Sequence, residues 1–250
     1  MDIFFELYQD LPRGGPGSTE CTKKAYSLLP ELPKQPKTLD VGCGVGPQTM
    51  ALAGCTAGQI TAIDTHQPFL DKLERKIKAA NLSDRINVLN CSMFKMTFEP
   101  ESFDIIWSEG AIYLMGFENG LKAWRSFLKP GGYLVVSELS WLKADANPTQ
   151  ELYDFWMEEY PGIKSINENL TIISKCDYTE IAHFTLPEAV WWDEFYTPLE
   201  QRIRALQKKY SKHPKASQVL NREANEIALF RRYSKWYGYV FYLMQKKDSD

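Results

Sequence analysis

Three glycines, Gly42, Gly44 and Gly46, alternate with other residues between Asp40 and Pro47. A glycine has no Cβ, so a chain with this spacing can turn sharply and approach a ligand closely. The apolar residues before the turn predict a short buried strand, and Pro47 suits the first turn of a helix. The free N–H groups at the start of such a helix favour a polar or anionic ligand. We therefore predict a ligand-binding turn between a strand and a helix, with a tight turn that binds no ligand as the alternative.

The spacing of these glycines separates the turn from two familiar nucleotide-binding turns. A dinucleotide-binding turn needs G-x-G-x-x-G, and Pro47 occupies the position of its third glycine. A phosphate-binding P-loop needs a lysine after its last glycine, and none follows Gly46. The turn is therefore typical of neither, although an NAD-dependent oxidoreductase stays as a less favoured alternative.

Further polar residues follow the predicted strands in sequence. Asp64 ends the second strand, about 20 residues beyond the glycine turn, where nucleotide-binding folds place an acid on the ribose hydroxyls. A solvated acid at a strand end is the alternative. Thr65 comes next, and Ser92 and Met93 follow the strand predicted over residues 86–91. Ligands of open parallel sheets bind beyond the carboxyl ends of the strands, so we expect these residues to border one site.

The strand predicted from Phe103 should flank the same crevice, and Ser108, Glu109, Gly110 and Tyr113 follow along it. Glu109 is the best candidate for an acidic group at a reactive centre, where it would act as a base. It can instead bind the ammonium group of a cofactor or substrate, or cap a helix. Tyr113 would present its hydroxyl to a substrate. We therefore predict Glu109 and Tyr113 as catalytic residues.

Two segments outside the predicted alternation of strands and helices are expected to cover this site. Residues 1–30 comprise a predicted arm and a helix, with Arg13 and Gly15 in the glycine- and proline-rich end of the arm. The arm either stays flexible or folds over the site with Arg13 against a carboxylate. Residues 187–236 form a predicted helical cap before the last strand, in which Thr197 is expected to cap a helix.

The cap combines aromatic and basic residues. Its aromatic stretch at 191–196 allows an apolar pocket, a site for a cation on a ring face, packing on the sheet or a dimer contact. Residues 200–236 carry ten Lys and Arg against three Asp and Glu, although the whole chain has a net charge of −3. No module that combines basic residues with stacking aromatics is recognisable there, so the pattern disfavours nucleic acid. A small molecule is the expected partner.

Composition places these elements in a single α/β domain over residues 1–250. The chain is 44% hydrophobic, enough for a full core, and no apolar run approaches the roughly 20 residues of a membrane span. Its five cysteines form no C-x-x-C pair and its three histidines lie far apart, so we expect neither a metal site nor disulfides. These features indicate a cytoplasmic protein with no membrane partner, and the sequence leaves open whether it is a monomer or a homodimer.

With these motifs in order, most of the chain resembles the class I methyltransferases that depend on S-adenosylmethionine (SAM). The resemblance rests on D-V-G-C-G-V-G at 40–46, Asp64, F-D-I-I-W-S-E-G at 103–110 and L-K-P-G-G at 128–132. A group of uncharacterised bacterial and archaeal small methyltransferases is similar at W-S-E-G-A-I-Y (107–113), Y-G-Y-V-F-Y (237–242) and R-G-G-P-G-S (13–18). Gly15 stands at the first glycine of that group's G-P-G run, and Gly14 replaces its polar residue.

The resemblance implies a Rossmann-like, mostly parallel sheet of seven strands in the order 3-2-1-4-5-7-6. Helices would cover both faces, and strand seven would run antiparallel. The expected cofactor residues are Arg13, Gly15, Asp40, Gly42, Gly44, Gly46, Asp64, Thr65, Ser92, Met93, Ser108, Glu109 and Gly110. Among them Asp64 would bind the ribose, and Ser92 and Met93 would face the adenine. Many members carry an acid at the position of Ser92, which cannot supply that charge.

The implied activity is transfer of the SAM methyl group to nitrogen, oxygen or carbon of a small molecule, which leaves S-adenosylhomocysteine. SAM is already activated, so the protein would mainly align the acceptor for in-line displacement. A SAM-binding regulatory or scaffold protein without turnover shares every cofactor motif and is the alternative. A closed pocket beside Glu109 would favour the enzyme, and a flat, open surface there would favour the scaffold.

Overall fold

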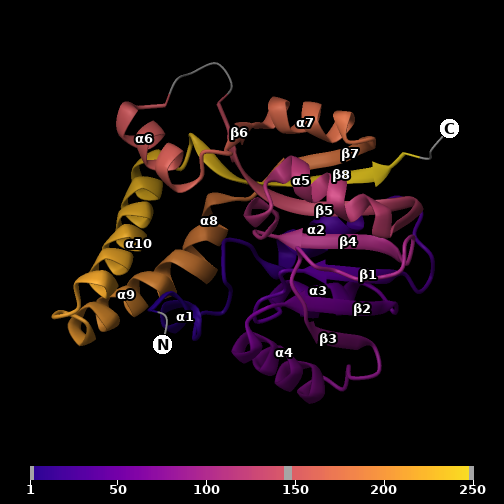
Figure 1. Cartoon of the computed structure of the whole chain (residues 1–250), viewed down its shortest axis with the longest axis horizontal. Coiled ribbons are helices and arrows are strands. Elements are labelled where there is room, and N and C mark those ends of the chain that lie inside the picture. The colour runs from indigo at the N-terminus through magenta and orange to yellow at the C-terminus, as the bar shows by residue number, and fades with distance from the viewer. Residues whose placement is uncertain (1–2, 144–147, 248–250) are drawn as a thin grey trace.

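A computed structural model describes residues 3–143 and 148–247, arranged around one mixed sheet (Figure 1). Residues 1 and 2 of the predicted arm lie outside the described residues. The strands are β1 (Lys37–Val41), β2 (Gln59–Asp64), β3 (Ile86–Asn90), β4 (Phe103–Glu109), β5 (Leu128–Trp141), β6 (Lys164–Ser165), β7 (Tyr178–Thr185) and β8 (Tyr237–Lys246). The sheet order is β3-β2-β1-β4-β5-β8-β7, and the two-residue β6 pairs with the end of β5.

This order confirms the predicted topology. With the short β6 set aside, the remaining seven strands follow the order 3-2-1-4-5-7-6. β8 runs antiparallel to both β5 and β7, whereas β1 to β5 pair in parallel. The carboxyl ends of β1 to β4 therefore meet at one edge of the sheet, which is where open α/β folds bind their ligands.

Helices cover both faces of the sheet. They are α1 (Ile3–Tyr8), α2 (Thr19–Ser27), α3 (Pro47–Cys55), α4 (Gln67–Ala79), α5 (Phe117–Trp124), α6 (Gln150–Glu159), α7 (Ile166–Lys175), α8 (Glu188–Trp191), α9 (Thr197–Lys209) and α10 (Pro214–Tyr233). Short helical turns are η1 (Ile112–Leu114), η2 (Arg125–Phe127) and η3 (Trp192–Tyr196).

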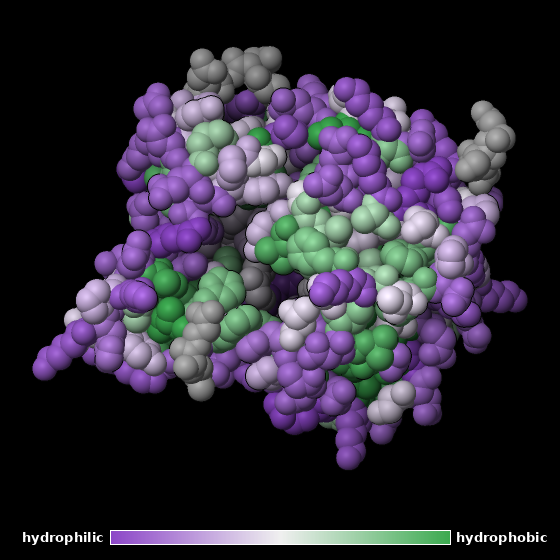
Figure 2. Space-filling view, in the orientation of Figure 1, coloured by the Kyte–Doolittle hydropathy of each residue, from purple (hydrophilic) through white to green (hydrophobic). Residues whose placement is uncertain are grey.

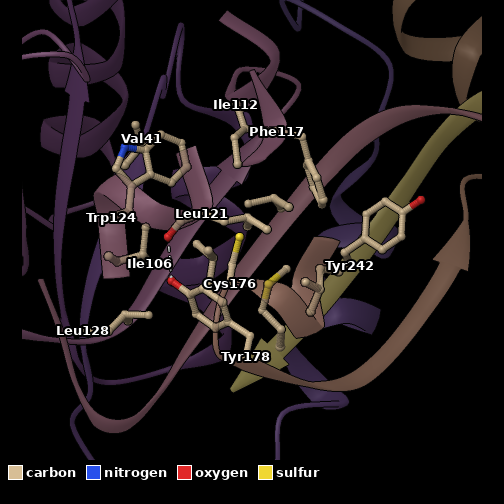
Figure 3. Close-up of a cluster of buried hydrophobic side chains, with 14 of the residues drawn as sticks. Val41, Ile106, Ile112, Phe117, Leu121, Trp124, Leu128, Cys176, Tyr178 and Tyr242 are labelled. Atoms are coloured by element: carbon tan, nitrogen blue, oxygen red, sulfur yellow. Dashed lines mark hydrogen bonds between the residues drawn. The ribbon is translucent and has the colours of Figure 1, made fainter. Parts of the chain in front are cut away.

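β4 supplies both faces of the core because successive side chains of a strand point to opposite sides. Ile105 and Trp107 pack with the apolar residues of α2, α3 and α4. Ile106 packs on the other side with α5 and α7, in the cluster drawn in Figure 3. There the hydroxyl of Tyr178 donates to the carbonyl of Leu121 at 3.0 Å. Burial on both faces explains why β4 is apolar without alternation.

The cap segment, residues 187–236, folds into α8, η3, α9 and α10, which stand to one side of the sheet with α1 and α6 (Figure 1). These elements share a core of aromatic and aliphatic side chains, which also includes Leu139 of β5 and Tyr237 of β8. α1 is tied to α9 through Glu6, whose carboxylate accepts hydrogen bonds from Lys209 at 2.7 Å and from Tyr210 at 2.6 Å. Both hydrogen bonds lower the pKa of Glu6.

The expectation that Thr197 caps a new helix is wrong. The chain is already helical from Glu188, and the π-turn η3 leads directly into α9. Thr197 itself has helical backbone angles, φ −61° and ψ −51°. Because no helix N-terminus exists at this point, there are no orphan N–H groups for a cap to satisfy.

Candidate functional site

Asp40 holds the glycine turn from inside the protein. Its side chain is fully buried and accepts hydrogen bonds from Thr49 at 2.6 Å and from Gln48 at 3.5 Å, both on the first turn of α3. Gln48 also donates to the carbonyl of Cys43 within the turn, at 3.1 Å. Burial raises the pKa of Asp40 to about 7. Asp40 therefore positions the turn from the protein interior, and its side chain does not reach the surface where a ligand would bind.

A cleft of about 1000 Å³ opens over the glycine turn at the ends of β1 to β4. Most of the predicted cofactor residues line it, namely Arg13, Gly15, Gly42, Gly44, Asp64, Thr65, Ser92, Met93, Glu109 and Gly110. The topology thus brings together residues from the arm and from four strand ends.

Gly46 and Ser108 are absent from the lining of this cleft. Gly46 precedes α3 with φ +80°, and a Cβ there would lie 2.1 Å from Cδ1 of Leu73. Ser108 is buried and donates a hydrogen bond to the carbonyl of Val41 at 3.0 Å, which links β4 to β1. Both residues therefore support the backbone of the site without lining the cleft.

Asp64 joins the glycine turn to the segment that starts α4. One carboxylate oxygen accepts from the N–H of Gly44 at 2.9 Å, and the other accepts from the N–H of His66 at 2.9 Å. A carboxylate oxygen can accept more than one hydrogen bond, so Asp64 retains capacity for ligand hydroxyls.

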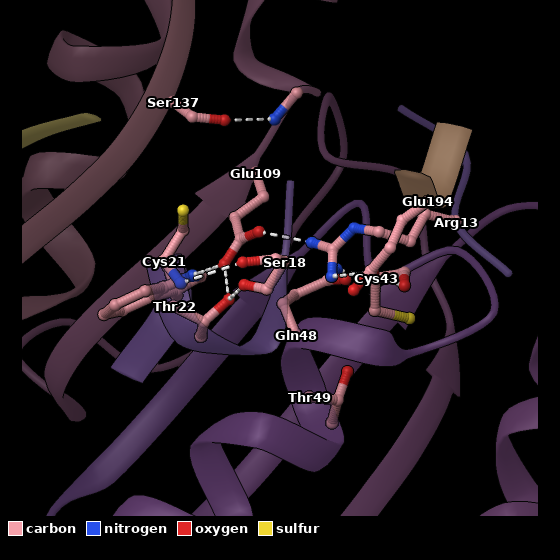
Figure 4. Close-up of polar contacts among 12 residues, drawn as sticks. Arg13, Ser18, Cys21, Thr22, Cys43, Gln48, Thr49, Glu109, Ser137 and Glu194 are labelled. Carbon is pink, nitrogen blue, oxygen red and sulfur yellow. Dashed lines mark hydrogen bonds and ion pairs between the residues drawn. The ribbon is translucent and has the colours of Figure 1, made fainter. Parts of the chain in front are cut away.

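Glu109, at the end of β4, is held by three donors (Figure 4). One oxygen pairs with Nη2 of Arg13 at 2.7 Å, and the other accepts from Thr22 at 2.6 Å and from the indole N–H of Trp107 at 2.9 Å. The side chains of Arg13 and Glu109 are each only 4% exposed. A role in proton abstraction would require one of these donors to move, so the catalytic role of Glu109 stays a prediction.

Arg13 ties the arm to the floor of the cleft. Its Nη1 lies 3.8 Å from a carboxylate oxygen of Glu194 and has no hydrogen-bond acceptor among the residues that the structure describes. Gly17 leaves space for the guanidinium, since a Cβ there would lie 2.6 Å from Nη2. A buried guanidinium nitrogen without a hydrogen-bond partner, in the lining of a cleft, suits an anionic group of a ligand.

A second chamber of about 900 Å³ adjoins the cleft. Gly14, Gly15, Pro16 and Gly110 line both cavities, so they form the boundary between them. The chamber walls carry eight aromatic side chains, Phe4, Tyr8, Tyr113, Trp156, Tyr160, Trp191, Phe195 and Tyr239, and the charged residues Glu159, Arg222, Glu223 and Glu226. Figure 2 shows the surface hollowed between the cap and the sheet. Tyr113 thus lines the chamber and not the cleft.

Several residues of this site have no role in the sequence analysis. Glu223 and Glu226 counted there only toward charge, although their spacing of three residues places them on one helix face. Tyr239 depends on the placement of β8, which brings its hydroxyl beside Gly110, 3.6 Å from where a Cβ of that glycine would be. Thr22 was not predicted, because nothing local indicates that it donates to Glu109.

Comparison with known proteins agrees with this geometry. Residues 38–132, less than half of the chain, match the family model described as a methyltransferase domain. Sterol 24-C-methyltransferase erg6 of Aspergillus fumigatus is 27% identical over 174 residues, which cover 65% of this chain and 45% of that protein. The chain spans about half the length of the curated relatives it matches.

Solved structures match nearly the whole chain. A SAM-dependent methyltransferase from Thiobacillus denitrificans, in complex with S-adenosyl-L-homocysteine, aligns with a TM-score of 0.83 at 18% identity, over 99% of both chains. The 4+2 cyclase SpnF aligns with a TM-score of 0.75 at 17% identity, over 98% of this chain and 94% of SpnF. The chain therefore has the Rossmann-like fold of these solved SAM-dependent methyltransferases, and residues 38–132 match the methyltransferase domain model.

Other features of the described chain bear on partners. None of the helices in residues 3–143 and 148–247 is long and apolar enough to cross a membrane. The same residues contain no group of three His, Cys, Asp or Glu side chains placed to hold a metal ion. All five cysteines are free.

Proposed function

We propose that this protein binds SAM in the cleft and transfers its methyl group to a small molecule held in the adjoining chamber. The observation that carries the proposal is the shared boundary at Gly110 and residues 14–16. A donor in the cleft and an acceptor in the chamber would meet there. The match to the methyltransferase domain model and the fold support the same activity.

The cleft offers the groups that SAM requires. At Gly44 no atom lies within 4 Å of where a Cβ would be, so the turn leaves open space for a ligand. Asp64 would accept hydrogen bonds from the ribose hydroxyls, and Ser92 and Met93 would line the adenine end. Nη1 of Arg13, which has no hydrogen-bond partner among the described residues, would donate to the SAM carboxylate. Bound SAM supplies a methyl group activated on a sulfonium.

The contribution of the chain itself would be alignment of the acceptor and exclusion of water. Alignment alone contributes roughly 7–11 kcal/mol to lowering such barriers. Residues 1–30 and 187–236 would form the cover of the two cavities, with Glu109 anchoring the arm through Arg13. Tyr239, whose hydroxyl lies beside Gly110 at the boundary, would form a hydrogen bond with the acceptor, and burial raises the pKa of this hydroxyl well above its usual value.

The second chamber also bears on the alternatives. A SAM-binding scaffold needs no second cavity beside its cofactor cleft, whereas an enzyme needs a place for its acceptor. The 4+2 cyclase SpnF shares the fold, so the fold alone does not specify methyl transfer. An NAD-dependent oxidoreductase is disfavoured by Pro47, which stands where a dinucleotide-binding turn needs its third glycine.

Calorimetric titration of the full chain with SAM, with NAD as the control, tests the cofactor. We expect micromolar binding of SAM and none of NAD. Incubation with methyl-labelled SAM and a library of small molecules then tests turnover, with label transfer and release of S-adenosylhomocysteine as the readouts. SAM binding without label transfer to any acceptor would favour the scaffold. Absence of binding by both SAM and S-adenosylhomocysteine would refute the proposal.

A further inference from the structure

We propose that the acceptor is an organic amine, bound as its ammonium form between the aromatic walls of the chamber and the carboxylates of Glu223 and Glu226, one of which would take its proton before transfer. The freed nitrogen lone pair would then form the N–C bond as the S–C bond of the sulfonium breaks, and S-adenosylhomocysteine would leave. This inference rests on the proposed function, because it assigns a chemical class to the acceptor of the same site. Two features carry it: carboxylates without an ion-pair partner, and aromatic ring faces.

Glu223 and Glu226 line the chamber from one face of α10. Glu223 accepts a hydrogen bond from the hydroxyl of Tyr8 at 2.7 Å, and Glu226 accepts one from the hydroxyl of Tyr196 at 2.8 Å. Within residues 3–143 and 148–247, no Lys, Arg or His nitrogen lies within the 4.0 Å of an ion pair with either carboxylate. Their hydrogen-bond partners are neutral phenols, and the charge of Arg222 offsets only part of the effect of burial on their pKa values, so two acids face the chamber without an ion-pair partner.

Arg222 is the basic residue in the described chamber lining, and it is already neutralised. Its guanidinium pairs with Glu159, which lines the same chamber. Burial, together with the charge of neighbouring Glu223, raises the pKa of Glu226 to about 7, and burial also raises the pKa of Glu223. Because unpaired carboxylates are costly to bury, a ligand cation at this position would stabilise the ionised pair.

The aromatic walls select for the same ligand chemistry. The faces of Trp, Tyr and Phe rings attract organic cations within about 6 Å. A pocket for a neutral apolar molecule has no need of two facing acids, and a carboxylate or phosphate ligand would be repelled by them. The combination therefore favours a protonated amine over an alcohol or an acid of the same shape.

Another buried carboxylate lies close to the chamber wall. Glu138 is 2% exposed, and burial raises its pKa to about 8. Burial chiefly raises the pKa values of Tyr113, Tyr160 and Tyr239, which all line the chamber, and the nearby carboxylate of Glu138 adds to the effect. A third acid therefore lies close to the wall, and a bound cation would favour its ionised form as well.

The test compares amines with alcohols of the same shape. The full chain, saturated with S-adenosylhomocysteine, is titrated by calorimetry with benzylamine and benzyl alcohol, 2-phenylethylamine and 2-phenylethanol, and tryptamine and tryptophol. We expect at least one amine to bind about tenfold more tightly than its alcohol at neutral pH, which corresponds to about 1.4 kcal/mol. Absence of amine binding at millimolar concentration, or equal affinity in all three pairs, would overturn the inference.

Variants assign the preference to the two acids. Changing Glu223→Gln and Glu226→Gln together should reduce the amine preference to about twofold or less, the loss expected when a charge contact is removed. Glu158→Gln, at an exposed position of α6, is the matched control and should keep the preference. A double variant that keeps the preference would overturn the inference, and the wild-type comparison decides the question if that variant fails to fold.

Binding of S-adenosylhomocysteine separates this inference from the proposed function. If the wild-type chain binds neither SAM nor S-adenosylhomocysteine, the proposed function fails. If it binds S-adenosylhomocysteine but shows no preference for any amine, only the assignment of the acceptor class fails.

Discussion

Alanine substitutions at Gly44 and Gly46 should separate cofactor binding from stability. Both glycines have left-handed backbone angles, with φ of +54° at Gly44 and +80° at Gly46. This region costs a non-glycine residue roughly 1–2 kcal/mol, so each alanine variant should lose about that much free energy of unfolding. The two positions differ in what the new methyl group would meet.

At Gly46 the added Cβ would lie 2.1 Å from Cδ1 of Leu73, which is fully buried. Overpacking of a core costs a further 1–3 kcal/mol or so, which makes the expected total for Gly46→Ala about 2–5 kcal/mol. At Gly44 no protein atom lies within 4 Å, and the residue lines the cleft. Gly44→Ala should therefore lose only about 1–2 kcal/mol, from backbone strain.

Binding should show the opposite order. The methyl group of Gly44→Ala enters the space proposed for SAM, so we expect the Kd for SAM to rise about tenfold or more, which is about 1.4 kcal/mol. Gly46→Ala, measured where it is fully folded, should change that Kd by less than about threefold, because Gly46 does not line the cleft.

Urea denaturation measures the stabilities, and calorimetry measures the affinities. Gly54→Ala is the matched control, because Gly54 lies in α3, is exposed, and has no atom within 4 Å of its Cβ position. It should leave SAM binding unchanged and add about 0.5–1 kcal/mol of stability. Wild-type affinity in Gly44→Ala would refute the assignment of the turn to SAM, and equal stability of the Gly44 and Gly46 variants would refute the packing argument.

Three further predictions concern charged groups. Asp64→Asn should weaken SAM binding by about 1.5–3 kcal/mol, the value of a hydrogen bond to a charged group. Calorimetry measures the Kd, with Asp71→Asn at an exposed position as the control. An unchanged Kd in Asp64→Asn would exclude the assignment of Asp64 to the ribose. Arg13→Met should lower the free energy of unfolding in urea by about 3 kcal/mol, because it leaves Glu109 buried without its cation; a variant as stable as the wild type would show that the pair contributes nothing. Burial raises the pKa of Glu138 to about 8. Between about pH 4.5 and pH 8 the folded chain therefore keeps a proton that the unfolded chain releases. The free energy of unfolding of the wild type should fall as the pH rises through this range, by about 3 kcal/mol at pH 7. Glu138→Gln should flatten this decline in urea titrations at pH 5 and pH 8, and identical pH profiles would contradict the argument.

The sheet and its glycine turn could be predicted because their signals are local. Apolar strands, a turn that needs positive φ and a proline at the start of α3 each act through a few neighbouring residues. The strand order came from the resemblance to a known family, and the pairing of β8 between β5 and β7 agrees with it. Thr197 was misjudged although its local sequence suits a cap, because the preceding residues continue the helix through η3.

The sequence by itself therefore determined the glycine turn and the alternation of strands and helices, since these depend on steric preferences and periodicity along the chain. The strand order and most residues of the cleft followed from the resemblance of its motifs to a known family. Only the tertiary structure decided the partners of the charged side chains. Arg13 meets Glu109 from 96 residues away, and Glu223 faces a chamber. Basic residues of the cap pair with distant acids, as Lys209 does with Glu6. Such pairs form where packing of the core brings separate elements together, and spacing along the chain does not encode them.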